Sequence, residues 1–125
     1  MDTNKNFLKV DELLELAIKF EQESADYYRK LQNQVEDSRV LDMLKELEQQ
    51  EIEHRDILKN FELGDKPYPL LQFGPSFSIT LPEIESESPS LRELMDVAIE
   101  REIVSRQIYT TTAGQVFGNL AQVLQ

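Results

Sequence analysis

The 125-residue chain contains no cysteine, one histidine (His54) and no long apolar run. Without cysteine, disulfides, zinc fingers, iron–sulfur clusters and thiol chemistry are excluded, whereas oxygen and nitrogen ligands for a metal remain. Lysine and arginine number 13 against 24 aspartate and glutamate, so the net charge is −11. This acidic balance argues against nucleic acid and anionic membranes as partners, because both need clustered basic residues. No apolar stretch approaches the roughly 18 residues of a membrane span. We expect one soluble, cytoplasmic domain.

Apolar residues recur at steps of three and four, which predicts an all-α protein. The expected helices are at about 10–35, 38–62 and 90–113, with the start of a fourth at about 115–125. The first two are joined by only a few residues and should form an antiparallel hairpin. The fourth lies in the charge-free ending and is expected to be incomplete.

The segment 63–89 has a different composition, since it holds all five prolines. No helix of normal length fits between them. The segment is nevertheless too apolar for a disordered linker, which predicts an ordered strap over one face of the bundle. It is long enough to return along a helix and start the third helix parallel to the second. One long crossover between helical hairpins, here between the second and third helices, is the ferritin-like up-down bundle arrangement.

Four ionisable residues interrupt the apolar helix stripes. Glu21 follows Ala17 by four residues, and Glu102 follows Ala98 by four. Glu51 and His54 form an E-x-x-H pair, whose spacing places both side chains on one helix face, and that face is predicted to be buried. An unpaired buried carboxylate is costly or takes up a proton, so the group indicates a shared cation. Carboxylates with imidazole suit iron or manganese.

An internal repeat relates the first and third helices at an offset of 81 residues. Ala17 to Glu21 can be laid on Ala98 to Glu102, and a tyrosine follows seven residues after each glutamate, Tyr28 and Tyr109. Two related hairpins joined by a crossover would give this pattern.

These motifs resemble the rubrerythrin-like branch of the ferritin-like di-iron proteins. The carriers are A-I-x-x-E-x-x-S-A-x-Y-Y at 17–28, E-x-x-H at 51–54, and A-I-x-x-E with Tyr109 in the third helix. The resemblance implies two irons in the bundle, with manganese or zinc as other occupants, and either hydrogen peroxide reduction or ferrous iron oxidation. It also implies roles for each residue: Glu21 and Glu102 as single-helix ligands, Glu51 as a bridge, His54 as a terminal ligand, and Tyr28 and Tyr109 as donors that orient the carboxylates.

The sequence departs from the family pattern twice. It lacks the four-cysteine rubredoxin-like site, so an enzyme would need an external electron donor. Glu51 follows Glu21 by 30 residues, and the same interval from Glu102 reaches position 132, with a histidine near 135. We therefore expect a shortened chain or a variant whose site is incomplete and can be empty.

Several interpretations stay open. The site could belong to a di-iron oxidoreductase, to a metal-binding or storage protein without turnover, or to a structural module that forms a homodimer or higher oligomer. Glu51 and His54 could be a surface pair, and Glu21 could pair with a tyrosine or lysine. Glu102 could pair with a neighbouring arginine, and the tyrosines could be core residues. The arginines near Glu102 are Arg92, Arg101 and Arg106.

Overall fold

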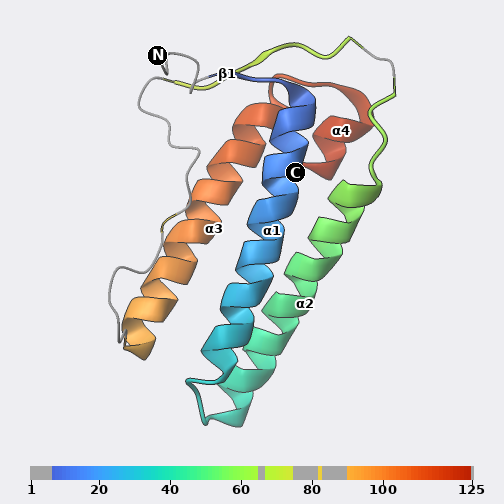
Figure 1. Cartoon of the computed structure of the whole chain (residues 1–125). Coiled ribbons are helices and arrows are strands. Elements are labelled where there is room, and N and C mark those ends of the chain that lie inside the picture. The colour runs from blue at the N-terminus through green and yellow to red at the C-terminus, as the bar shows by residue number, and fades with distance from the viewer. Residues whose placement is uncertain (1–6, 65–66, 75–81, 83–89, 125) are drawn as a thin grey trace.

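The computed structural model describes residues 7–64, 67–74, 82 and 90–124. Their fold is dominated by three long helices, each of 23 residues. The elements in chain order are β1 (Phe7–Leu8), α1 (Val10–Gln32), α2 (Ser38–Asn60), β2 (Leu71–Gln72), α3 (Leu91–Ala113) and α4 (Gly118–Val123) (Figure 1). The all-α prediction is confirmed, and none of the described helices is long and apolar enough to cross a membrane.

The observed helices are slightly shorter than expected. α1 ends at Gln32 and α2 at Asn60, two to three residues before the predicted ends. α3 begins at Leu91, because Ser90 is its cap: the Ser90 hydroxyl accepts from the Glu93 amide, and the Glu93 carboxylate accepts from the Ser90 amide. α4 has only six residues and starts three residues later than predicted, after Phe117.

The three long helices are arranged around α1. Figure 1 shows α2 and α3 running in the same direction and α1 running against both. α1 packs along α2 and also against α3, whereas α2 and α3 barely approach each other. The parallel course predicted for the second and third helices is confirmed. The end of α2 and the start of α3 lie at opposite ends of the bundle (Figure 1).

Two apolar clusters fill the bundle, with a polar layer between them. The first cluster gathers the early part of α1 with the ends of α2 and α3 and with α4, and contains Val10, Leu13, Leu14, Ala17, Phe20, Leu58, Leu71, Phe73, Ile108, Leu120 and Leu124. The second gathers the opposite ends of the long helices and contains Tyr28, Leu31, Leu44, Leu94 and Ala98. Along α1, α2 and α3, the predicted ligands fall between these clusters, so apolar packing fixes the helices on both sides of them.

The described part of the crossover packs on the bundle, as predicted. Leu71 and Phe73 are buried in the first cluster. β2 pairs with β1 in antiparallel register, Phe7 opposite Gln72 and Leu8 opposite Leu71. The Gln115 side chain, just after α3, accepts from the Gln72 amide at 2.7 Å and donates to its carbonyl at 2.6 Å. The rest of the expected strap, 75–81 and 83–89, lies outside the described residues.

Candidate metal centre

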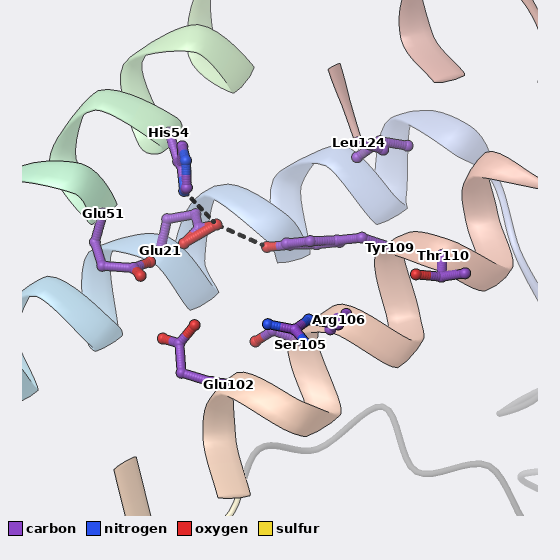
Figure 2. A pocket seen from close by; sticks show the side chains of 9 residues that line it. All are labelled: Glu21, Glu51, His54, Glu102, Ser105, Arg106, Tyr109, Thr110 and Leu124. Carbon is purple, nitrogen blue, oxygen red and sulfur yellow. Dashed lines mark hydrogen bonds and ion pairs between the residues drawn. The ribbon is translucent and has the colours of Figure 1, made fainter. Parts of the chain in front are cut away.

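The four residues predicted as metal ligands surround one cavity in the polar layer. Glu21 comes from α1, Glu51 and His54 from α2, and Glu102 from α3, and all line a cavity of about 470 Å³ (Figure 2). The helical spacing of the sequence explains this convergence, because each glutamate continues a stripe that packs against a neighbouring helix. Leu124, directly after α4, also lines the cavity.

Three of the four side chains form a tight group. Glu21, Glu51 and His54 each offer one ligand atom, and these atoms lie within 4.8 Å of one another. The His54 Nδ1 is 3.8 Å from the Glu21 Oε1. Such spacing allows one cation to contact two carboxylates and an imidazole.

Burial differs within this group. Glu21 and Glu51 are each only 6% exposed, as predicted for residues in the apolar stripes. The prediction that His54 shares the buried face is wrong, since its side chain is 58% exposed. In the described part of the chain, α1 packs along one side of α2, and no long helix covers the opposite side. The His54 imidazole therefore lies at the rim of the cavity.

Glu102 stands beside this group, held by a tyrosine. Its side chain is half-buried, and its Oε1 accepts a hydrogen bond from the Tyr28 hydroxyl at 3.0 Å. Both Glu21 and Glu102 act electrostatically on the Glu51 carboxyl. Glu51 is therefore a carboxyl group that interacts with both of the others.

Tyr109 repeats this relationship in the opposite direction. Its hydroxyl lies 3.4 Å from the Glu21 Oε1 and 3.4 Å from the Ala17 carbonyl oxygen, and shares one proton between them. Tyr28 on α1 thus donates to the glutamate of α3, and Tyr109 on α3 donates to the glutamate of α1. The internal repeat of the sequence appears here as a reciprocal pair of contacts.

The carboxyl groups disturb one another electrostatically. Burial, together with hydrogen bonding and charge from Glu21 and Glu102, raises the pKa of Glu51 to about 10. Burial and the neighbouring carboxylates raise the pKa of Tyr28 and of Tyr109 above the usual range, so both phenols stay protonated donors. At neutral pH Glu51 therefore holds a proton unless a cation replaces it.

The competing structural interpretations can now be compared with the contacts. Glu51 is not part of an exposed surface pair, because it is buried. Glu102 has a tyrosine partner rather than Arg101, whose guanidinium instead donates to the Pro82 carbonyl at 3.0 Å and lies over the Tyr27 ring. The Tyr28 and Tyr109 hydroxyls donate hydrogen bonds to Glu102 and Glu21, and their role in orienting metal ligands stays a prediction.

Sequence reasoning missed four residues that line the cavity: Ser105, Arg106, Thr110 and Leu124. The sequence contains a signal for two of these four residues. Ser105 matches Ser24 in the internal repeat, and Arg106 follows Glu102 by four residues, which places both on one helix face.

Comparisons with protein-family models, curated proteins and solved structures find no match for this chain. The candidate function therefore depends on the site itself: three carboxyl groups and an imidazole around a cavity, with two phenols oriented toward the carboxylates. This donor set is chemically suited to a hard or borderline divalent cation such as Mn²⁺, Fe²⁺ or Zn²⁺.

Proposed function

We propose that this protein is a rubrerythrin-like member of the ferritin-like di-iron proteins, which binds iron in its helix bundle and either reduces peroxide or oxidises ferrous iron. The observation that carries the proposal is the meeting of Glu21, Glu51 and His54 within 4.8 Å, with Glu102 beside them. Each comes from a sequence position that the family resemblance assigns to a ligand.

The electrostatics of the site support a bound cation. Burial, together with the repulsion between three neighbouring carboxyl groups, holds the pKa of Glu51 far above its ordinary value. A divalent ion reverses this balance by stabilising the ionised carboxylates. The buried acids are then a binding site rather than an uncompensated cost to folding.

Each residue has a distinct role in the proposal. Glu21 and His54 would hold a metal from α1 and α2, and Glu51, between the other two glutamates, would bridge. Tyr28 and Tyr109 would orient Glu102 and Glu21 through their hydroxyl groups. Bound iron would supply the electron transfer to oxygen or peroxide. The open side at His54 would admit the small substrate.

A second function is favoured by one feature of the geometry. Glu102 lies outside the group whose ligand atoms are all within 4.8 Å, so the tightest arrangement suits a single ion. A one-metal site would make the protein a metal-binding or storage protein without turnover, with manganese or zinc as alternative occupants.

Metal content and turnover of the full chain distinguish these functions. Under the first proposal, anaerobic loading with ferrous iron gives two ions per chain, and the loaded protein consumes peroxide or oxidises added ferrous iron. One ion per chain without either reaction supports the binding function. Glu51→Gln should lose bound metal, whereas Glu53→Gln, which changes an exposed acid on the same helix, should not. Failure of the unmodified protein to retain any of the three metals would overturn both.

A further inference from the structure

Arg106 is a cationic side chain that the proposed metal site leaves unused. Arg106 is an exposed residue of α3 that lines the cavity together with Ser105 (Figure 2). Among the described residues, Arg106 makes no hydrogen bond or ion pair, although three carboxyl groups line the same cavity. A cation that faces a cavity without a partner is a ready site for an anion.

The charge balance of a metal-loaded site also favours a bound anion. This step depends on the proposed two-metal function. The ionised forms of Glu21, Glu51 and Glu102 carry three negative charges, and Arg106 adds one positive charge. Two divalent ions would leave two positive charges uncompensated in a partly buried site, which is costly without a further anion.

The ligand count supports the same conclusion. A ferritin-like di-iron site uses four glutamates and two histidines. The described residues bring three glutamates and one histidine to the cavity. Oxygen ligands from a bound anion would fill coordination positions that these side chains leave open.

The size of the cavity sets what can bind. About 470 Å³ is far more than peroxide or dioxygen requires, since a water molecule occupies roughly 30 Å³ of liquid. The volume falls in the range of small-molecule pockets, roughly 300–1,000 Å³. Ser105 and Thr110 add hydroxyl donors beside Arg106, and Leu124 adds an apolar wall.

We infer that the cavity binds an oxyanion, a carboxylate or a phosphate, between the metal ions and Arg106. Some oxygen atoms of the anion would contact the metals held by the glutamates, and others would accept hydrogen bonds from the Arg106 guanidinium group. The planar guanidinium group can donate two parallel hydrogen bonds to a carboxylate or to a phosphate. Ser105 and Thr110 would contribute further donors. The ligand is thus a small organic acid or phosphate compound rather than a neutral molecule.

Cobalt(II) provides a spectroscopic test on the full chain. The visible absorption of the cobalt-loaded protein reports the coordination of the metal, so binding of an anion to it changes the spectrum. Acetate and inorganic phosphate are titrated in turn, with chloride at matched ionic strength as the control for screening. We expect a saturable change with at least one oxyanion and none with chloride; the arm that saturates at lower concentration identifies the ligand class.

Substitutions at Arg106 make the test specific. Arg106→Gln should weaken oxyanion binding about tenfold or more, as expected for the loss of charge-assisted hydrogen bonds. Arg106→Lys should retain part of the affinity. Arg92→Gln, on the same helix but outside the cavity lining, should leave it unchanged.

The outcomes separate this inference from the proposed function. If cobalt does not bind, the metal centre fails and the oxyanion site with it. If cobalt binds but neither oxyanion alters the spectrum, or if Arg106→Gln binds both as tightly as the unmodified protein, the metal centre stands and the oxyanion site is overturned.

Discussion

The hydroxyl of Tyr28 on α1 donates a 3.0 Å hydrogen bond to the carboxylate of Glu102 on α3. The reverse contact, from Tyr109 on α3 to Glu21 on α1, is longer, at 3.4 Å, and shares its proton with a backbone carbonyl. The two helices therefore exchange donors across the candidate centre, and the shorter contact controls Glu102. Because Glu102 lies outside the tight ligand group, its position depends most on this partner.

Tyr28→Phe tests this dependence directly. The substitution keeps the buried ring but removes the only side-chain hydroxyl that contacts Glu102 among the described residues. We expect metal affinity to fall about 10- to 100-fold, the usual effect of losing a group that orients a ligand. Competition against a chromophoric chelator would measure it. Tyr27→Phe is the matched control, because the Tyr27 hydroxyl donates to the Leu94 carbonyl rather than to a candidate ligand. Equal losses in both variants would contradict the assignment.

Stability of the metal-free protein should fall as pH rises. Glu51 has a pKa of about 10 when folded, against 4.5 for an unperturbed glutamate. Between these two pH values the folded state binds more protons than the unfolded state. The contribution of Glu51 to the free energy of unfolding is therefore greatest below about pH 4.5 and declines toward pH 10. The slope is at most about 1.4 kcal/mol per pH unit for one proton, and solvent screening reduces it.

Thermal unfolding in the presence of a chelator, from pH 5 to pH 9, would measure this decline. Glu51→Gln should flatten it and raise the melting temperature at high pH, because a neutral amide cannot ionise. Glu53→Gln should retain the slope, since Glu53 is exposed. A melting temperature that rises steadily over the same range would show that Glu51 is ionised in the folded protein.

Metal binding at neutral pH should release a proton. The proton that Glu51 holds in the free protein must leave when the carboxylate becomes a ligand. Calorimetric titration with Zn²⁺ in two buffers of different ionisation enthalpy would count the protons released, and we expect about one per site. Tyr28 and Tyr109 should not contribute, because their raised pKa keeps them protonated. Binding enthalpies that do not depend on the buffer would be inconsistent with a protonated Glu51.

Helix periodicity was sufficient to locate the three glutamates. Glu21, Glu51 and Glu102 each share a helix face with buried apolar residues, and that spacing was enough to predict that they line one cavity. The same reasoning fails for Ile99, which precedes Glu102 by three residues and so lies on the same helix face, but is 56% exposed. It failed for His54 for a related reason: a stripe indicates which residues share a face, not whether another helix covers it.

Helix periodicity did not predict the contacts between segments that are far apart in the sequence. β1 and β2 have two residues each, too few for a period, and they pair across more than sixty residues of sequence. The partner of each tyrosine also depends on how α1 and α3 are placed against each other. The repeat indicated that Tyr28 and Tyr109 have equivalent positions, but only the packed structure shows that each contacts the other helix's glutamate.

The crossover should stabilise the bundle through one buried leucine. Leu71 is fully buried in the first apolar cluster, whereas the adjacent Leu70 is 53% exposed. Leu71→Ala should lower the free energy of unfolding by about 2–5 kcal/mol, because it removes core contacts and leaves a cavity. Leu70→Ala should change it by roughly 0.5 kcal/mol or less, as for surface substitutions. Chemical denaturation of both variants would measure the difference, and similar losses would mean that the crossover residue Leu71 is not part of the core. Since Leu71 belongs to the same apolar cluster as Leu58 and Ile108, which flank the candidate centre on α2 and α3, Leu71→Ala should also weaken metal binding through the spacing of these helices.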